Sequence, residues 1–245
     1  SDEVLTLQSA RNAREHLFSG VTTVRDRGAK NSTTFRLRNA IRMGITVGPR
    51  LVLSGRPISI IGGHLSYFGI EVTGPNECRA AVRQLMKEGA DFIKVTATGG
   101  TTITSLPLLP SFNLDELKAI CEEAHKFGLH VAAHCSCSQG IANALDAGVD
   151  TIIHAYFREP DGSNVFKPEL ADRIAQQGVF VNATLAGRHV EIEQLELKME
   201  AEGLTDVELA ELDENREMKE IRLEHFAKMR EMGVVMVAGS DSAWR

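Results

Sequence analysis

The sequence predicts an α/β protein built on a parallel sheet, and three observations support this class. Short β-branched runs alternate along the chain with amphipathic helical stretches, which is typical of βαβ units. The length of 245 residues fits one α/β barrel domain. Hydrophobic residues make up 43% of the chain and charged residues 24%, which is the composition of an ordinary folded protein and not of a disordered one.

The expected elements follow from the period of the apolar residues. In the stretch 4–18, Leu5, Ala10, Ala13 and Leu17 share roughly one face, which predicts a helix. Helical stretches of the same kind cover 33–43, 76–88, 114–127, 138–147 and 168–177. Short apolar or β-branched runs predict strands at 21–28, 49–55, 91–96, 130–134, 151–154, 179–184 and 233–242. A Gly-rich loop containing "IIGGHLSYFG" separates the second strand from the third helix.

This order predicts a TIM-type (β/α)8 barrel. Seven strands, each preceded by a helix, suggest that the first strand lies upstream of Ser1 and that the last helix also lies outside this chain. We therefore interpret residues 1–245 as one partial catalytic barrel domain. The charged stretch at about 187–232 is longer than one barrel helix needs, so it predicts a helical excursion that ends in the last complete helix.

Charge and composition exclude several classes of partner. The formal net charge is −6 and no block of Lys or Arg occurs, which argues against nucleic acid and favours a small-molecule substrate. No apolar run approaches the roughly 18 residues of a membrane span. The four cysteines, Cys78, Cys121, Cys135 and Cys137, contain no C-x-x-C pair. Reduced thiols and a cytoplasmic location are the expectation, and a homo-oligomer is compatible with the sequence.

Polar residues at the ends of the predicted strands are the candidates for chemistry. Lys94 lies in strand 91–96, His134 ends "HVAAH", His154 ends "TIIH" and Asp241 ends "VVMVAGSD". The carboxyl ends of parallel barrel strands gather at one mouth, so we expect these side chains to converge. A lysine aimed into a barrel needs a charge partner or a modification, because a buried ammonium is costly.

These residues carry a resemblance to a known family. The order Lys, His, His, Asp within "GADFIKVTATGG", "HVAAHC", "GVDTIIHA" and "VAGSDS" resembles the amidohydrolase superfamily. The likeness is to its imidazolonepropionase-related and prolidase-like branch, which "SGVTTVRDRG" and "RPISIIGGH" also match. The resemblance implies a centre of two metal ions, usually zinc, bridged by a carboxylated lysine. By motif position Lys94 would be that lysine, His134 and His154 would bind the second ion, and Asp241 would bind the first.

The residue chemistry agrees with this assignment. A neutral lysine amine adds CO₂ to give a carbamate, which replaces a buried cation by an anion able to span two cations. Imidazole and carboxylate are ligands that zinc accepts, and two zinc ions can share a hydroxide at neutral pH. One departure stands out: the family's His-x-His pair, which supplies its first two ligands, occurs nowhere in this sequence. We expect that pair upstream of Ser1.

Four further residues are candidates for substrate binding. His64 follows a Gly pair in "GGHLSYFG", where the resembled branch often places a substrate-facing histidine, although a loop-surface histidine is the alternative. Tyr156, Asn182 and His189 lie just past predicted strand ends and could line the pocket. The tyrosine that prolidase-like relatives carry after the fifth-strand histidine has no counterpart in "HCSCSQG", which weakens a dipeptidase assignment.

The sequence thus predicts a metal-dependent hydrolase of C–N bonds in an amide, cyclic amide, dipeptide, urea or carbamate. In this reading a metal-bound hydroxide attacks the carbonyl, and Asp241 carries the proton to nitrogen. The alternative is a non-catalytic barrel fragment with at most one weak metal site, serving as a scaffold or assembly surface. A deaminase of the same superfamily is disfavoured, because those enzymes usually use one metal and no bridging lysine.

Overall fold

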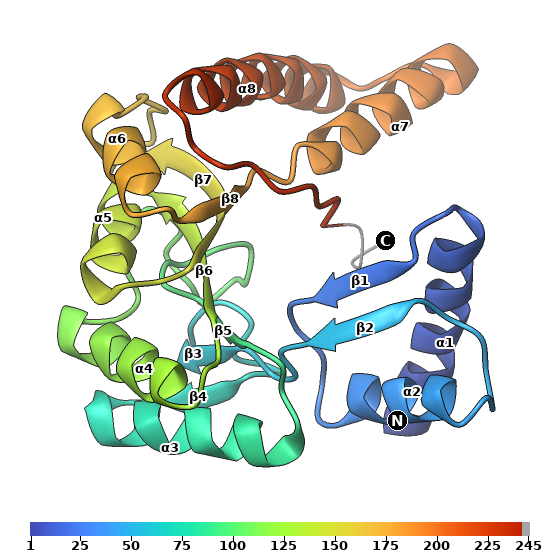
Figure 1. Ribbon diagram of the computed structural model, residues 1–245. Helices are drawn as coiled ribbons and strands as arrows, with labels where there is room; N and C mark the ends of the chain where they lie inside the picture. The colour runs from blue at the N-terminus through green and yellow to red at the C-terminus, as the bar shows by residue number, and fades with distance from the viewer. Residues whose placement is uncertain (242–245) are drawn as a thin grey trace.

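A computed structural model of the chain describes residues 1–241. Its helices alternate with parallel strands, which confirms the predicted α/β class (Figure 1). In chain order the elements are α1 (Asp2–Phe18), β1 (Thr23–Asp26), α2 (Thr33–Arg42), β2 (Arg50–Leu53), β3 (Ile58–Ile60), β4 (Ile70–Val72), α3 (Gly74–Glu88), β5 (Ile93–Val95), α4 (Leu114–Lys126), β6 (Val131–Cys137), α5 (Ser138–Ala147), β7 (Thr151–Arg158), α6 (Pro168–Gln176), β8 (Phe180–Asn182), α7 (Ala186–Glu202) and α8 (Asp206–Glu231).

The strands form two parallel sheets. One has the order β4-β3-β5-β6-β7-β8, and the other is the pair β1-β2. Asp91 joins them: its backbone N–H donates to the carbonyl of Leu53 at 2.7 Å, and its carboxylate accepts from the Leu53 N–H at 2.8 Å. The end of β2 therefore lies beside the start of β5, and the strands follow one another as in a barrel wall.

The larger sheet is buried on both faces. Every residue of β6 is buried, and so are all three residues of β5. The apolar sides of α3, α4, α5 and α6 cover the outside of this sheet (Figure 1), with Leu85, Leu117, Ile141 and Ile174 in one continuous core. Strands covered on both faces need apolar residues at successive positions, which explains why "HVAAH" and "TIIH" do not alternate.

Local signals set the helix boundaries. The Asn113 side chain and Glu116 form a capping box at the start of α4, in which Glu116 accepts from the Asn113 N–H at 2.8 Å. Gly89 ends α3 with φ +98°, a left-handed conformation that favours glycine. These caps bring the chain directly back into the next strand.

The structure corrects three sequence-based expectations. Two short strands, β3 and β4, lie within what was expected to be only a loop, because three-residue strands leave no readable period. Strands β6 and β7 continue past His134 and His154, so neither histidine is the last residue of its strand. The segment 233–241 makes only an isolated parallel bridge, Val181 to Met236, where a regular strand was expected. Residues 242–245 lie outside the described part of the chain.

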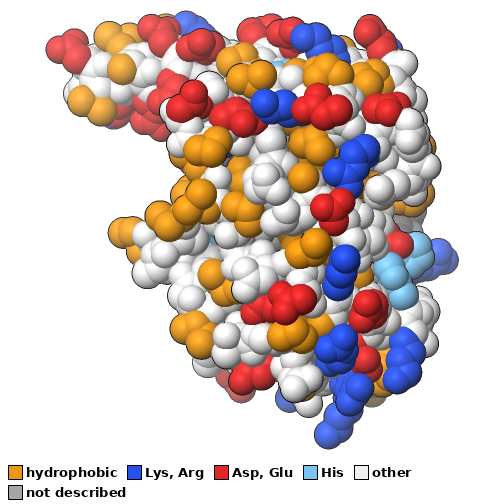
Figure 2. All heavy atoms as spheres, turned by 90° about the vertical axis from the view of Figure 1, so that its left-hand side faces the viewer, with side chains coloured by type: hydrophobic (Ala, Val, Ile, Leu, Met, Phe, Trp, Pro, Cys, Tyr) orange, Lys and Arg blue, Asp and Glu red, His pale blue; other side chains and the backbone are white. Residues whose placement is uncertain are grey.

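Two long helices follow the larger sheet. Helices α7 and α8 lie at the top of the molecule in Figures 1 and 2, where Figure 2 shows many acidic side chains over them. A capping box of Thr205 and Glu208 starts α8. No helix within residues 1–241 is long and apolar enough to cross a membrane. The assignment of residues 1–245 to one partial barrel domain stays a prediction.

Candidate active site

Three of the predicted residues come from neighbouring strands. Lys94 pairs in register with Ala132 of β6, His134 pairs with Ile153 of β7, and His154 pairs with Cys135. Lys94 and His134 are buried, with exposed fractions of 4% and 6%, and His154 is half-buried. Because parallel neighbours in register present their side chains at one edge, the three residues converge as the sequence predicts.

Three histidine rings lie in a row at this edge. The ring centroids of His64 and His134 are 4.5 Å apart, and those of His134 and His154 are 4.6 Å apart. His64 is 7% exposed and its Nδ1 lies 3.1 Å from the Thr102 hydroxyl. A Cβ added at Gly100 would lie 2.7 Å from the His64 ring, so only glycine fits against it. The predicted loop histidine is therefore part of the buried site and not of the loop surface.

The hydrogen bonds of His134 and His154 leave one nitrogen of each ring free. Nε2 of His134 lies 3.0 Å from the Gly99 carbonyl, and since a carbonyl only accepts, this nitrogen carries the proton. The neutral ring then has its lone pair on Nδ1. Nδ1 of His154 lies 2.7 Å from the Thr184 hydroxyl, which leaves Nε2 without a hydrogen bond to the described residues. A hydrogen bond at one ring nitrogen orients an imidazole whose other nitrogen binds a metal.

Burial keeps these imidazoles neutral. It lowers the pKa of His64 to about 4, with a smaller contribution from Lys94. The pKa values of His134 and His154 lie well below the usual range for histidine, again because of burial first. A neutral imidazole is the form that binds a metal.

Lys94 is an isolated buried amine. Within residues 1–241 it makes neither a hydrogen bond nor an ion pair. Burial, with repulsion from Arg27, lowers its pKa to about 7 although Asp241 acts in the opposite direction. A substantial fraction of the amine is therefore neutral at physiological pH, and a neutral amine is the form that reacts with CO₂.

The backbone of β7 is distorted where it carries His154. His154, Ala155 and Phe157 have φ values of +74°, +54° and +51°, which residues with side chains rarely adopt. The pairing with β6 shifts register between Cys135 and Cys137. A bulge of this kind re-aims side chains, and here it accompanies the turn of His154 towards Thr184.

Strand β1 adds charge from the opposite side. The Arg25 guanidinium lies 3.9 Å from the centre of the Phe92 ring and donates to the Thr151 hydroxyl at 3.4 Å. Arg27 is influenced by Asp241, which favours its charged form. Asp241 is exposed, and its charge acts on both Arg27 and Lys94. The fourth predicted residue therefore faces the same centre.

The other predicted substrate residues have different surroundings. Tyr156 is half-buried beside His154, with ring centroids 5.0 Å apart, and its hydroxyl lies 3.5 Å from that of Thr184. Asn182 is fully buried; its side-chain N–H donates to the Ala238 carbonyl at 2.9 Å, and its Oδ1 has no partner within the described residues. His189 is exposed on α7 and lines a cavity between α7 and α8.

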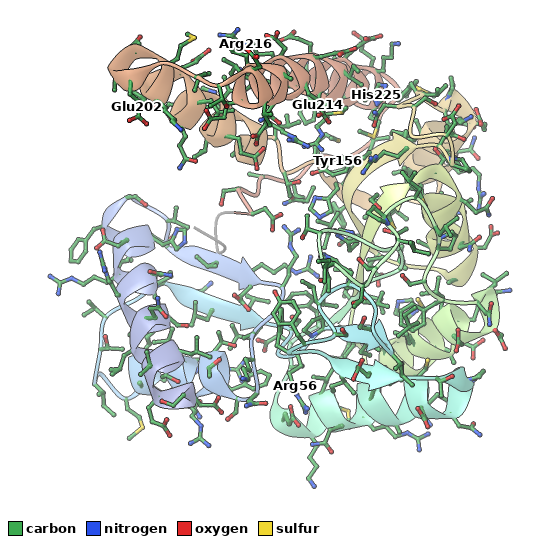
Figure 3. The ribbon with its side chains drawn as sticks, turned by 180° about the vertical axis from the view of Figure 1, so that it is seen from behind. Arg56, Tyr156, Glu202, Glu214, Arg216 and His225 are labelled. Atoms are coloured by element: carbon green, nitrogen blue, oxygen red, sulfur yellow. The ribbon has the colours of Figure 1, made fainter. Side chains whose placement is uncertain are left out.

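Sequence reasoning missed several residues at this edge. Thr102 holds His64 through its hydroxyl, as Thr184 holds His154. Arg222 lies 3.7 Å from the centre of the Tyr156 ring, and His225 lies against Phe157. Figure 3 shows Tyr156 and His225 between α8 and the sheet, with Arg216 on the far side of α8. Thr102 lies in the loop after β5, where no strand signal marks it, and nothing in the local sequence of α8 singles out Arg222.

The donor set fits a divalent metal ion in part. Two neutral imidazoles with free lone pairs are zinc ligands, and a carbamate on Lys94 would add an anionic oxygen donor. Within residues 1–241 no three His, Cys, Asp or Glu side chains are arranged as a complete metal site. The residues that are present suit one side of a metal centre.

Known proteins resemble this chain over nearly its whole length. The Amidohydrolase family profile matches residues 1–244. Ochratoxinase of Aspergillus niger is 27% identical over 260 residues, which cover 96% of this chain and 50% of that protein. The chain therefore spans about half the length of this curated relative.

Solved structures show the same relationship. A Xaa-Pro dipeptidase with bound methionine superposes with a TM-score of 0.81 and 28% identity, covering 99% of this chain and 60% of that one. A prolidase complexed with N-methylphosphonate-L-proline gives a TM-score of 0.80 and 26% identity, covering 98% of this chain and 59% of that one. These likenesses confirm the barrel-type fold and the predicted superfamily. The chain belongs to the Amidohydrolase family.

Proposed function

We propose that the protein is a metal-dependent hydrolase that cleaves a C–N bond in an amide, cyclic amide, dipeptide, urea or carbamate. The observation that carries this proposal is the convergence of Lys94, His134 and His154. Each side chain lies at the same edge of the sheet, and both imidazoles are neutral with one nitrogen held and the other free. A purely structural histidine pair has no need of that arrangement.

We assign the residues as follows. His134 and His154 would hold one metal ion through Nδ1 and Nε2 respectively, and carbamylated Lys94 would contribute to both ions. Zinc is the metal we propose, because imidazole and carboxylate-type oxygens are its usual nitrogen and oxygen ligands. When bound, such ions would polarise the scissile carbonyl and lower the pKa of water.

The remaining chemistry belongs to the chain itself. Asp241 is exposed at the mouth, where it would accept a proton from the attacking water and deliver it to the departing nitrogen. Tyr156 and His64 flank the histidine row and would position the substrate on either side. Asn182 would fix the backbone of Ala238 beside the site through its hydrogen bond to the Ala238 carbonyl.

The relatives favour this reaction type but leave the substrate open. One relative is an ochratoxinase and the structural neighbours include a Xaa-Pro dipeptidase and a prolidase. We propose a small-molecule substrate and a cytoplasmic setting for this chain as well. The four cysteines are all buried and unpaired, which is compatible with a reducing compartment.

Replacement of Lys94 tests the proposal. In the full-length protein, Lys94→Ala should lose bound zinc, and kcat/KM for amide substrates should fall by about 10³-fold, the scale for removing a group that acts on the transition state. Metal analysis and hydrolysis assays measure the two effects, and a short-chain carboxylic acid should restore part of each. Lys87→Ala, an exposed lysine on α3, is the control.

Two results would contradict the assignment. Full zinc content in Lys94→Ala would remove the bridging role. A wild-type protein that binds no metal and hydrolyses none of a panel of N-acyl amino acids, Xaa-Pro dipeptides and aryl-ureas would favour the non-catalytic scaffold instead.

A further inference from the structure

A cavity of about 220 Å³ lies between α7 and α8, outside the histidine row. Its walls include Leu185 and Leu223, and its cationic lining consists of Arg188, Lys219 and Arg222. A second, smaller cavity contains His154 and Tyr156 and shares Leu185 and Arg222 with the first. Arg222 therefore separates the candidate catalytic centre from the larger cavity.

The charges around this cavity do not balance. Arg188 is paired with the Glu191 carboxylate at 3.1 Å and also donates to the Asn215 side-chain oxygen. Arg222 and Lys219 make neither a hydrogen bond nor an ion pair within the described residues. The Nε–H of Arg222 is buried and has no acceptor. Glu191 also acts on Arg222 electrostatically, so one carboxylate is shared by two of the three cations.

Arg222 is held in place without an ion pair or hydrogen bond to its guanidinium from the described residues. Its guanidinium stacks 3.7 Å from the centre of the Tyr156 ring, and burial lowers its pKa from the usual arginine value. An arginine does not lose its proton in proteins, so the group stays a cation with an unsatisfied donor. An anion that accepted from its N–H groups would offset this cost.

The position of Arg222 relates it to the reaction centre. The Tyr156 ring contacts both the Arg222 guanidinium, 3.7 Å from its centre, and the His154 ring, whose centroid is 5.0 Å away. One aromatic ring therefore links the cation to a candidate metal ligand. A group bound to Arg222 would be close to the scissile bond along the substrate, with apolar atoms against Leu185 and Leu223.

We propose that Arg222, assisted by Lys219, forms a subsite for a free carboxylate of the substrate, so that the protein prefers acidic amides with an apolar side chain. Arginine suits this task because its planar fork matches a carboxylate through two parallel hydrogen bonds. This inference rests on the proposed function. It adds a specificity determinant supplied by α8.

A pair of substrates tests the subsite in the metal-loaded full-length protein. N-acetyl-L-leucine and N-acetyl-isopentylamine share the scissile amide and the apolar chain, and only the first has a carboxylate. The wild type should show a kcat/KM at least about 10-fold higher for the acid, the size of one charge-assisted hydrogen-bonded pair. In Arg222→Gln the ratio of the two kcat/KM values should fall by about 10–100-fold.

Matched variants control the experiment. Arg216→Gln changes an exposed arginine on the far side of the same helix, where Arg216 pairs with Glu196 at 2.7 Å (Figure 3), and should leave the ratio unchanged. Lys219→Gln should lower it by only about 2–5-fold, since lysine binds as a point charge. If Arg222→Gln does not fold, Lys219→Gln carries the test. An unchanged ratio in the folded Arg222 variant would overturn the subsite.

Calorimetric binding separates this inference from the proposed hydrolysis. If the protein binds metal but hydrolyses neither compound, weaker binding of N-acetyl-L-leucine by Arg222→Gln than by Arg216→Gln still supports the subsite, and equal binding overturns it. Inorganic phosphate distinguishes the source of the anion. Phosphate that binds as tightly as N-acetyl-L-leucine and loses the same affinity in Arg222→Gln would show a general anion site and overturn the assignment to a substrate carboxylate.

Discussion

The two sheets of this molecule differ in burial and in the chemistry they carry. In the larger sheet β5 and β6 are wholly buried, whereas no residue of β1 is buried and only Leu53 is buried in β2. The buried sheet carries the candidate metal ligands Lys94, His134 and His154. The less buried pair carries Arg25, and Arg27 follows it; the charges of these two residues act on that centre.

This difference indicates that one sheet would hold the metal ligands and that the other would supply charge. Ligands must be held in fixed geometry, which close packing on both faces of a strand provides. Charges act over a longer distance and tolerate a looser support. The following predictions test whether the division holds, beginning with the residue that lies between the two regions.

The charge of Asp241 acts both on Arg27, which follows β1, and on Lys94 of β5. Asp241→Asn keeps the size of the side chain but cannot accept a proton, so kcat should fall by about 10²–10⁴-fold while KM changes little. Steady-state kinetics on the metal-loaded full-length protein measure this effect. An unchanged kcat would remove Asp241 from the mechanism and leave the two regions without a functional link.

Matched truncations compare the packing of the two sheets. Ile152 on β7 is fully buried, and Ile152→Ala should lower the free energy of unfolding by about 2–5 kcal/mol. Val24 on β1 is half-buried, and Val24→Ala should cost about 1 kcal/mol or less. Urea titrations followed by circular dichroism report both values. Equal losses would mean that β1 is as tightly held as β7.

Thr184 tests the support of a ligand within the buried sheet. Thr184→Val keeps the shape but removes the hydroxyl that holds Nδ1 of His154, so metal affinity should fall by about 10–100-fold. Competition with a chelator of known affinity measures the change. Thr104→Val, whose hydroxyl bonds only the exposed Gly62 carbonyl, is the control and should retain the affinity. A loss of metal affinity in both variants would indicate that removing a threonine hydroxyl loosens the fold in general, and not that Thr184 positions His154.

Asp26 provides the smallest effect, and it depends on pH. Burial raises the pKa of Asp26 to about 6 from its usual value near 4, although Gly28 N–H and Arg27 act in the opposite direction. The unfolded chain thus releases the proton first as pH rises, and Asp26 costs stability increasingly between pH 4 and 6. Asp26→Asn should therefore be more stable than the wild type by about 1 kcal/mol at pH 7 and equally stable below pH 4.

Denaturant unfolding at several pH values checks this prediction. Asp2→Asn, at the start of α1, is the control and should not gain stability over the wild type as pH rises, because an ionised carboxylate stabilises a helix N-terminus. A stability gain of Asp26→Asn that is the same at pH 4 and pH 7 would show that the carboxylate does not carry the effect.

Much of the fold follows from local sequence. The runs around Lys94, His134 and His154 predicted β5, β6 and β7 because strands buried on both faces read as continuous apolar segments. Strands β3 and β4 are too short for such a signal. The segment 233–241 has the composition of a strand, yet pairing is decided by the neighbour that a strand meets, and among the described residues only Val181 makes strand-type backbone bonds to it.

The site was predictable to the extent that its residues lie in or next to segments that read as strands. Lys94, His134, His154 and Tyr156 lie in β5, β6 and β7, and the structure brings them together. Arg222 reaches the same place from the middle of α8, and only tertiary packing puts its guanidinium against Tyr156. The distortion of β7 at His154 could not be predicted from the sequence either, because no glycine marks the left-handed positions.

The loop after β5 has a consequence for the exchange of metal ions. Gly99 holds His134 through its carbonyl and Thr102 holds His64 through its hydroxyl, and the two residues are three positions apart. A single outward movement of this loop would release both rings together. Uptake and loss of an ion would then proceed at the rate of loop opening and not at the rate of ligand dissociation, so a chelator should strip the metal at a speed independent of its own concentration.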